Sequence, residues 1–221
     1  SKILPDFLVQ YINSEIGRAR LRGLEVGSTI LHINTKDLKK FRVPVPSLAE
    51  QKKIAEILTV WDKALTTTEK LIDNAKAQKK ALMQQLITGK KRFPEFEREE
   101  WQEVFVGDMG DIISGGTPKS EKTEYWDGHI LWCTPTDITA LNHRYISDTK
   151  RKITDDGLKT SSAKKLPAGS LLICTRATIG ALAISAQTMT TNQGFKSIVP
   201  NAMFDVDFLY FLFLQNKNEL I

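Results

Sequence analysis

The side chains best able to support catalysis or bind a metal are three histidines, two cysteines and 26 acidic residues. His32, His129 and His143 stand apart from one another, each near an expected turn or strand. The acidic residues form no group with the spacing of metal ligands on a helix or strand. The chain also lacks a glycine-rich phosphate loop and the HExxH, CxxC and GxSxG motifs. We therefore expect a chain with no catalytic residues and no metal site of its own.

The two cysteines, Cys133 and Cys174, are far apart in the sequence and flanked by apolar, strand-like residues. Two cysteines are too few for a disulfide framework or a structural zinc site. No apolar run reaches the ~18 residues that span a bilayer, and the first residues lack the pattern of a signal peptide. These features predict a reduced, cytoplasmic protein without a membrane segment.

The net charge of +5, from 31 basic and 26 acidic residues, is concentrated in one region. Between Glu50 and Arg92 there are ten basic and five acidic residues, so this region carries the whole excess of five. The preference for cations near the C-terminus of a helix explains part of this bias. The charge is compatible with binding to nucleic acid, but it is not sufficient to establish it.

The element that organises the chain is a long helix. Residues 47–88 contain no glycine or proline, and their apolar residues recur at alternating spacings of four and three. This is the a/d pattern of a coiled-coil seam. Ser47 and Glu50 form a capping box at the start, while Gly89 and Pro94 end the helix. The pattern predicts a helix about 60 Å long.

The seam of this helix predicts a partner. Eight of its ten positions are apolar, and Thr68 and Lys79 are departures that could fix the register. The apolar positions are Ile54, Leu58, Trp61, Leu65, Ile72, Ala75, Leu82 and Leu86. A single helix with one apolar stripe is not stable alone in water. We therefore expect another helix to cover the seam.

The segments on either side of the long helix differ in character. Residues 5–21 have apolar residues at helical spacing and predict one helix. After Pro94, short apolar runs alternate with turn residues, which predicts strands and loops before a last helix over residues 205–220. The expected strands are residues 104–106, 111–114, 130–133, 170–175, 181–185 and 196–199. The predicted fold class is α+β, with a coiled-coil-forming spacer helix joined to a mixed α/β domain.

Several stretches of the sequence form a recognisable set. One group is Pro46-Ser47-Leu48-Ala49-Glu50-Gln51 at the start of the helix, Val43-Pro44-Val45 before it, and Thr88-Gly89-Lys90-Lys91-Arg92-Phe93 at its exit. Another is Gly115-Gly116-Thr117-Pro118 with Tyr125-Trp126 downstream, Arg176-Ala177-Thr178-Ile179-Gly180 and Thr191-Asn192-Gln193-Gly194-Phe195. The first group resembles the central conserved region of type I restriction–modification specificity subunits, the S (HsdS) subunits. The second resembles the target recognition domains of that family.

The resemblance implies two target recognition domains held apart by two long antiparallel helices, with each domain reading one half of a split DNA site. Residues 1–46 would then be the distal part of a first recognition domain, 47–88 the spacer helix and 89–100 a basic linker. Residues 101–221 would be the second domain, incomplete at its C-terminal end. The repeated tripeptide, Asp6-Phe7-Leu8 and Asp207-Phe208-Leu209, would mark equivalent points of the two domains.

The resemblance also implies partners and cofactors. A specificity subunit binds double-stranded DNA and docks modification (methyltransferase) subunits, and through them restriction subunits. In the family, S-adenosylmethionine is held by the modification subunit, and ATP and Mg belong to the restriction subunit. We therefore expect no cofactor in this chain, and we expect the spacer helix to set the half-site separation.

Reading DNA requires donors and acceptors aimed at base edges in the major groove, with cations that fix the position on phosphates. Loops between short strands can present such groups. Arg176 can form two hydrogen bonds to guanine, and Asn192 or Gln193 can do the same with adenine. The candidate DNA-binding residues are Lys119, Ser120, Lys122, Thr134, Thr136, Asp137, Arg144, Arg176, Thr178, Asn192 and Gln193. Trp126 and Trp132 are expected in the core.

Two further interpretations use the same seam. An antiparallel homodimer would cover it, and residues 1–46 of one copy would then lie beside residues 95–221 of the other. A coiled-coil scaffold that binds protein partners only would also cover it. The scaffold hypothesis assigns no function to the basic, glycine-rich loops, so DNA recognition is the leading hypothesis.

Overall fold

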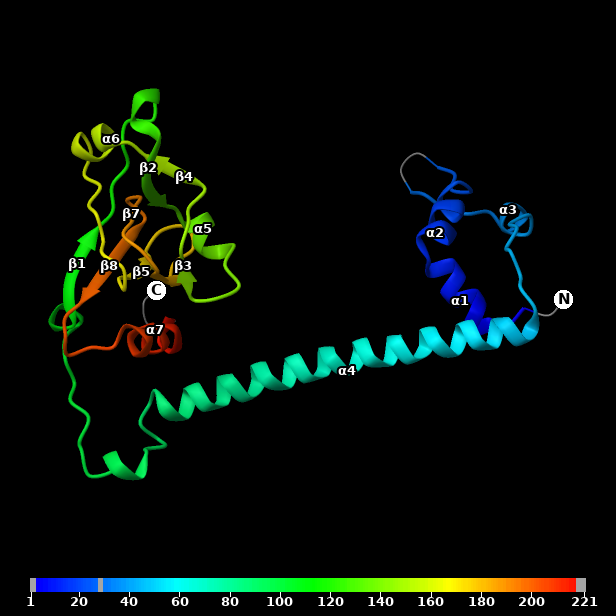
Figure 1. Cartoon of the computed structure of the whole chain (residues 1–221), viewed down its shortest axis with the longest axis horizontal. Helices are drawn as coiled ribbons and strands as arrows, with labels where there is room; N and C mark the ends of the chain where they lie inside the picture. The colour runs from blue at the N-terminus through cyan, green and yellow to red at the C-terminus, as the bar shows by residue number, and fades with distance from the viewer. Residues whose placement is uncertain (1–2, 28–29, 218–221) are drawn as a thin grey trace. The chain divides into compact units, whose positions relative to one another are not determined.

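The computed structural model of the chain describes residues 3–27 and 30–217. The chain divides into two compact units, Ser1–Gln78 and Lys79–Ile221 (Figure 1). Helices form the described elements of the first unit, and the second combines two β-sheets with helices. The predicted α+β class is confirmed.

The first unit contains α1 (Pro5–Asn13), α2 (Glu15–Arg22), α3 (Thr35–Leu38) and most of α4 (Leu48–Leu86). The prediction of one helix over residues 5–21 is wrong, because the chain breaks at Ser14. The extended backbone of Ser14 ends α1, and its hydroxyl oxygen accepts a hydrogen bond from the backbone N–H of Gly17 at 3.1 Å, which caps α2. A Cβ at Gly17 would lie 2.0 Å from the carbonyl oxygen of Tyr11, so the tight corner requires glycine.

A buried glutamine joins α1 to the start of α4. Gln51 is 1% exposed. Its Oε1 accepts a hydrogen bond from the backbone N–H of Leu4 at 2.8 Å, and its Nε2 donates to the carbonyl oxygen of Pro46 at 2.9 Å. Ala55, one turn along the same face, is also buried. Because both ends of the amide are hydrogen-bonded, burial of Gln51 is tolerated and fixes α1 against the first turns of α4.

Helix α4 has 39 residues and confirms the long helix predicted over residues 47–88. The Ser47 hydroxyl oxygen accepts a hydrogen bond from the backbone N–H of Glu50 at 3.3 Å, which caps its start. Gly89, with a φ of +69°, follows its end in the left-handed conformation that glycine favours. The Ser47 cap and the stop at Gly89 expected from the sequence therefore bound the helix.

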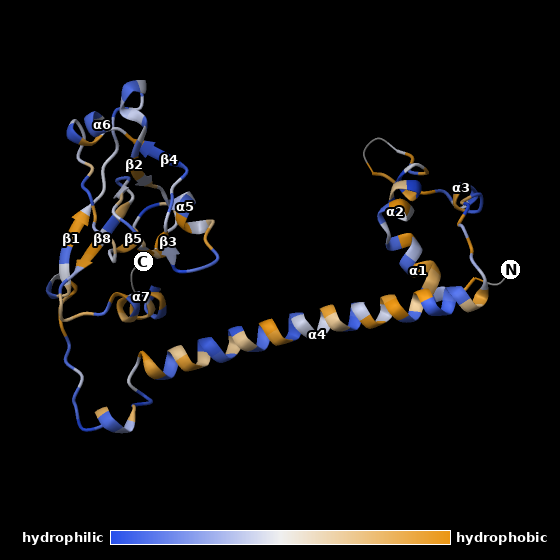
Figure 2. Cartoon of the chain, in the orientation of Figure 1, coloured by the Kyte–Doolittle hydropathy of each residue, from blue (hydrophilic) through white to orange (hydrophobic). Residues whose placement is uncertain are grey.

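The seam of α4 is largely exposed in this chain. Its positions Leu58, Trp61, Leu65, Ile72 and Leu82 are between 38% and 66% exposed. Ala75 is also exposed, whereas Ile54 and Leu86 are half-buried. Figure 2 shows the same pattern as apolar bands spaced along a mixed helix. The partner helix therefore stays a prediction.

Within residues 3–27 and 30–217, no helix is both long and apolar enough to cross a membrane.

The second unit is built on two β-sheets, one of five strands in the order β1-β8-β5-β6-β3 and one of three in the order β4-β2-β7. The strands are β1 (Gly110–Ser114), β2 (Trp126–Cys133), β3 (Tyr145–Ile146), β4 (Arg151–Ile153), β5 (Leu171–Cys174), β6 (Leu182–Ser185), β7 (Thr190–Thr191) and β8 (Phe195–Pro200). The helices are α5 (Pro135–Thr139), α6 (Asp155–Lys159) and α7 (Val206–Gln215), with 3₁₀ turns at Pro94–Phe96, Val106–Asp108 and Thr123–Tyr125.

Strand β5 lies at the centre of the five-stranded sheet and contributes to two core clusters. Leu171 and Ile173 pack with Leu209 of α7, and all three are at most 8% exposed. Leu172 and Cys174 point to the opposite face, because side chains alternate along a strand, and they belong to the cluster that includes β2 residues. The sheet is thus covered by α7 on one face and by the three-stranded sheet on the other.

Five of the six predicted strands are present, as β1, β2, β5, β6 and β8. The strand predicted at residues 104–106 is wrong. There the Asp108 carboxylate accepts a hydrogen bond from the backbone N–H of Phe105 at 3.1 Å and closes a 3₁₀ turn. The helix predicted over residues 205–220 is α7, which ends at Gln215, and residues 218–220 lie outside the described part of the chain.

Candidate nucleic-acid interface

The loop after β1 and the loop after β7 lie against each other. The Thr117 hydroxyl donates a hydrogen bond to the side-chain oxygen of Gln193. A Cβ at Gly115 would lie 1.9 Å from the carbonyl oxygen of Asn192, so the backbones approach as closely as only glycine allows. Two stretches that carry candidate residues, far apart in the sequence, are therefore joined directly.

The loop between β5 and β6 also contacts the loop after β7, at Gly194. The backbone N–H of Thr175 donates to the carbonyl oxygen of Gly194 at 2.7 Å, and the Asn192 Oδ1 accepts from the backbone N–H of Gly194 at 2.9 Å. The Cβ of Arg176 is 3.8 Å from the position that a Cβ on Gly194 would take. Arg176 and Asn192 thus come together, with Thr178 further along the exposed loop.

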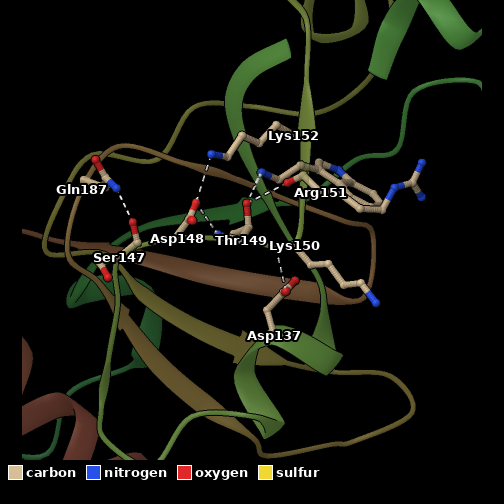
Figure 3. Close-up of polar contacts among 9 residues, drawn as sticks. Asp137, Ser147, Asp148, Thr149, Lys150, Arg151, Lys152 and Gln187 are labelled. Atoms are coloured by element: carbon tan, nitrogen blue, oxygen red, sulfur yellow. Dashed lines mark hydrogen bonds and ion pairs between the residues drawn. The ribbon is translucent and has the colours of Figure 1, made fainter. Parts of the chain in front are cut away.

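Helix α5 adjoins this cluster and is held by its own candidate residues. The backbone N–H of Asn192 donates to the carbonyl oxygen of Cys133 at 3.0 Å, just before α5. The backbone N–H and the hydroxyl of Thr134 both donate to Asp137 Oδ2, at 2.8 and 2.6 Å. The other oxygen, Oδ1, accepts from the backbone N–H of Lys150 at 3.0 Å (Figure 3). Both carboxylate oxygens of Asp137 therefore hold the fold together.

Two tryptophans support the loop after β1. Trp132 Nε1 donates to the carbonyl oxygen of Gly116 at 2.9 Å, and Trp126 Nε1 donates to that of Lys119 at 3.3 Å. The two rings pack edge to face with their centroids 4.9 Å apart. Both residues are less than 9% exposed, which confirms them as core residues. A buried indole N–H needs an acceptor, so these hydrogen bonds satisfy the rings and fix the loop.

A cation that the sequence pattern does not single out lies on these tryptophans. The guanidinium carbon of Arg151, in β4, is 3.6 Å from the Trp126 ring centre and 5.2 Å from that of Trp132. Arg151 is exposed. In Figure 3 its side chain extends away from that of Lys152. The sequence marks this residue only as part of the basic run at residues 150–152. Its position over the tryptophans depends on the pairing of β4 with β2, which places Arg151 opposite Trp132.

Seven of the eleven predicted DNA-binding residues are solvent-exposed. They are Lys119, Ser120, Lys122, Thr136, Arg176, Thr178 and Gln193. Lys122 pairs with Glu124 at 3.2 Å, and hydrogen bonding to that carboxylate raises the pKa of Lys122. Its positive charge is therefore partly offset within the chain.

Arg144 lies with a different set of residues. Its Nε donates to Asp207 Oδ1 at 2.7 Å, and its guanidinium carbon is 5.6 Å from the Phe211 ring centre. The hydroxyl of Tyr145 also donates to Asp207. These contacts tie Arg144 to α7 rather than to the loops around Gly194.

The described residues contain no group of three or more His, Cys, Asp or Glu side chains placed to hold a metal ion. Cys133 and Cys174 are buried free thiols. Burial raises the pKa of both, that of Cys174 to about 11, and so favours the unreactive thiol.

Comparisons with known proteins point in one direction. The family model described as the type I restriction modification DNA specificity domain matches residues 2–77 and 98–221. The type I restriction enzyme MjaIX specificity subunit of Methanocaldococcus jannaschii is 38% identical over 115 residues, which are 52% of this chain and 27% of the relative. The EcoR124I/EcoR124II specificity subunit of Escherichia coli is 27% identical over 199 residues, 86% of this chain and 47% of the relative.

The fold is shared with a solved structure, the type I restriction–modification system S subunit from M. genitalium. The TM-score is 0.61 at 19% identity, and the match covers 99% of this chain and 55% of that chain. This chain spans about half the length, or less, of the curated relatives it matches. Because the family model matches most of its residues, the chain belongs to the type I restriction–modification DNA specificity family.

Proposed function

We propose that this chain is the DNA-reading component of a type I restriction–modification enzyme. The domain of residues 101–221 reads one half of a bipartite DNA target, and residues 1–46 belong to the domain that reads the other half. Helix α4 sets the separation of the half-sites. The chain contributes no catalytic residue, since its relatives are named as specificity subunits.

The observation that carries the proposal is the meeting of loops around Gly194. Arg176, Asn192 and Gln193 have the donors and acceptors that match guanine and adenine edges in the major groove. Their loops are fixed by backbone hydrogen bonds and by glycine contacts, so little order must be imposed on binding. The exposed cation Lys119 adds attraction to the phosphate backbone.

The contacts also divide the candidates by role. Thr134 and Asp137 are hydrogen-bonded to each other, and Arg144 is paired with Asp207. We infer that these three support the fold, while the exposed loop residues and the half-buried Asn192 meet DNA.

The partners follow from the proposed role. Modification subunits dock on the chain along α4, and restriction subunits join through them. S-adenosylmethionine would be bound by the modification subunits, and ATP with Mg by the restriction subunits.

The exposed seam of α4 supports a further helix, which we infer to run antiparallel to it. A second copy of this chain would supply such a helix. Burying side chains such as Trp61 and Leu65, now 66% and 62% exposed, would contribute about 1.5–3 kcal/mol each. Light scattering at micromolar concentration that reports only a monomer would contradict the homodimer and leave DNA reading untouched.

Binding to mixed-sequence duplex DNA, measured over a series of salt concentrations, tests the proposal. The measurement is made with and without the modification subunit of the same system. We expect affinity that falls steeply with salt and sharpens to one split sequence when that subunit is present. No binding in either condition, by a well-folded helical dimer, would overturn DNA reading and favour a coiled-coil scaffold.

A further inference from the structure

Arg151 combines a fixed position with unused hydrogen-bond donors. Its guanidinium carbon lies 3.6 Å from the ring centre of Trp126, and a guanidinium in that position is attracted to the face of the indole. No described residue accepts a hydrogen bond from the guanidinium or forms an ion pair with it. The side chain is nevertheless exposed. Its charge is thus oriented by the protein but neutralised by none of the described residues.

Strand geometry separates Arg151 from the next cation, Lys152. Arg151 is opposite Trp132 in the register of β4 with β2, and Lys152 is opposite Leu131. Since successive side chains of a strand point to opposite faces, the two cations lie on different faces of the sheet. Lys152 forms an ion pair with Asp148, with 3.2 Å between Nζ and Oδ1 (Figure 3). Lys152 is therefore paired within the fold, whereas Arg151 is exposed to solvent.

The rings that hold Arg151 also hold the loop after β1. Trp126 contacts the guanidinium through its face and donates its Nε1 hydrogen to the carbonyl oxygen of Lys119 at 3.3 Å. The guanidinium of Arg151 and the backbone of Lys119 therefore border the same ring, and both residues are exposed. A guanidinium stacked on a ring presents its N–H groups as a planar fork at the ring edge, which matches two oxygens of a phosphate.

We propose that Arg151 contacts a DNA phosphate through this fork and, together with Lys119, fixes the duplex backbone beside the loop after β1. The inference rests on the proposed DNA-reading function and adds a positioning contact to it. A phosphate suits this place, because Arg151 and Lys119 are both exposed cations and cations fix a protein's position on the phosphate backbone. Base reading is left to the loops around Gly194.

The test compares Arg151→Gln with Lys152→Gln in the full chain, with a mixed-sequence duplex as the probe. Each variant loses one positive charge, from adjacent residues on opposite faces of β4, so the pair is matched in net charge. We expect Arg151→Gln to bind about tenfold more weakly near ~0.1 M salt, with a slope of log affinity against log salt that is smaller by about one. Lys152→Gln should retain the affinity and slope of the unaltered chain.

Three results would overturn the phosphate contact. They are an unchanged affinity of Arg151→Gln, equal losses in the two variants, and an unchanged affinity for the mixed-sequence duplex with a loss only for the split sequence bound in the presence of the modification subunit, which would instead indicate base reading. Arg151→Lys keeps the charge but removes the fork, so it should bind with intermediate affinity and a nearly unaltered slope. Thermal unfolding checks that each variant is folded.

The failure of this inference and the failure of the proposed function give different results. An unaltered chain that binds no DNA, with or without the modification subunit, overturns the proposed function and the phosphate contact together. If the unaltered chain binds DNA and Arg151→Gln binds it equally tightly, only the role of Arg151 is overturned.

Discussion

Helices α1 and α7 carry the same Asp-Phe-Leu tripeptide and bury it in opposite ways. In α1, Phe7 is 8% exposed and Leu8 is half-buried. In α7, Leu209 is completely buried and Phe208 is 40% exposed. One residue turns an α-helix by about 100°, so neighbouring Phe and Leu side chains face a packing surface unequally. The tripeptide occurs near the start of both helices without determining which of its residues is buried.

The surface under each helix decides the difference. Helix α1 is fixed to the first turns of another helix through Gln51. Helix α7 lies on a sheet, where Leu209 packs with residues of β5 and β6 such as Leu171 and Ile184. Phe208 turns away from that sheet and packs edge to face against Trp101, with 6.3 Å between the ring centroids. It also lines an open groove with a volume of about 690 Å³. The same tripeptide therefore lies in two helices, and the residue that each helix buries depends on the surface against which it packs.

The largest expected effect is in α7. Leu209→Ala should lower the free energy of unfolding by about 3–4 kcal/mol, because it leaves a cavity between the helix and the sheet. Phe208→Ala is the matched control and should cost only about 1 kcal/mol, because its ring is partly in solvent. Urea denaturation followed by circular dichroism measures both. Equal losses would show that the face toward the sheet does not dominate the stability of α7.

The same pair of substitutions should rank in the reverse order in α1. Phe7→Ala should cost about 2–3 kcal/mol, less than a fully buried phenylalanine since the first unit has a small core. Leu8→Ala should cost about 1 kcal/mol. The same denaturation measurement applies. A larger loss for Leu8 than for Phe7 would contradict the opposite burial of the two tripeptides.

Much of the fold could be predicted because its signals are local. The spacing of apolar residues and the caps at Ser47 and Gly89 are sufficient to define α4, and short apolar runs bounded by turn residues identify strands such as β1 and β8. Strand β7 could not be found in this way. Thr190 and Thr191 form a strand only because they pair in parallel with Trp132 and Cys133, which are distant in the sequence.

The candidate site divides along the same line. The loops with Arg176 and Asn192 could be predicted, because turn residues and polar side chains mark them. The position of Arg151 over Trp126 follows from the register of β4 with β2, and β4 has only three residues. The pairing of Arg144 with Asp207 likewise joins positions that are 63 residues apart. Contacts made by tertiary pairing leave no periodic signal in the sequence.

The junction of α1 with α4 should depend on one amide. Gln51→Ala should cost about 1–2 kcal/mol, because the backbone N–H of Leu4 and the carbonyl oxygen of Pro46 lose a buried partner. Gln78→Ala, on an exposed position of the same helix, is the control and should be neutral or slightly stabilising, since alanine has the higher helix propensity. A cost no greater than that of the control would mean that other contacts, such as the burial of Phe7 and the hydrogen bond from Gln10 to Asp62, hold α1 in place.

The smallest expected effect concerns the aspartate of the two tripeptides. Asp6 and Asp207 both lie in the first turn of their helices, so Asp→Asn at either position removes the same favourable interaction with the helix N-terminus. Asp207 additionally accepts hydrogen bonds from Arg144 and Tyr145. The side chains of Asp207 and Arg144 are about two-fifths exposed, so we expect Asp207→Asn to cost less than ~1 kcal/mol beyond Asp6→Asn.

Salt distinguishes the two contributions of Asp207. The excess cost of Asp207→Asn over Asp6→Asn should shrink as salt rises to ~1 M, because screening weakens an exposed ion pair. A persistent excess would assign the cost to the hydrogen bonds with Arg144 and Tyr145 rather than to charge. An excess of zero at low salt would mean that the aspartate acts alike in both helices, through the helix N-terminus only. The aspartate would then not distinguish the two helices, which differ in their N-caps and in which apolar neighbour, Phe7 or Leu209, they bury.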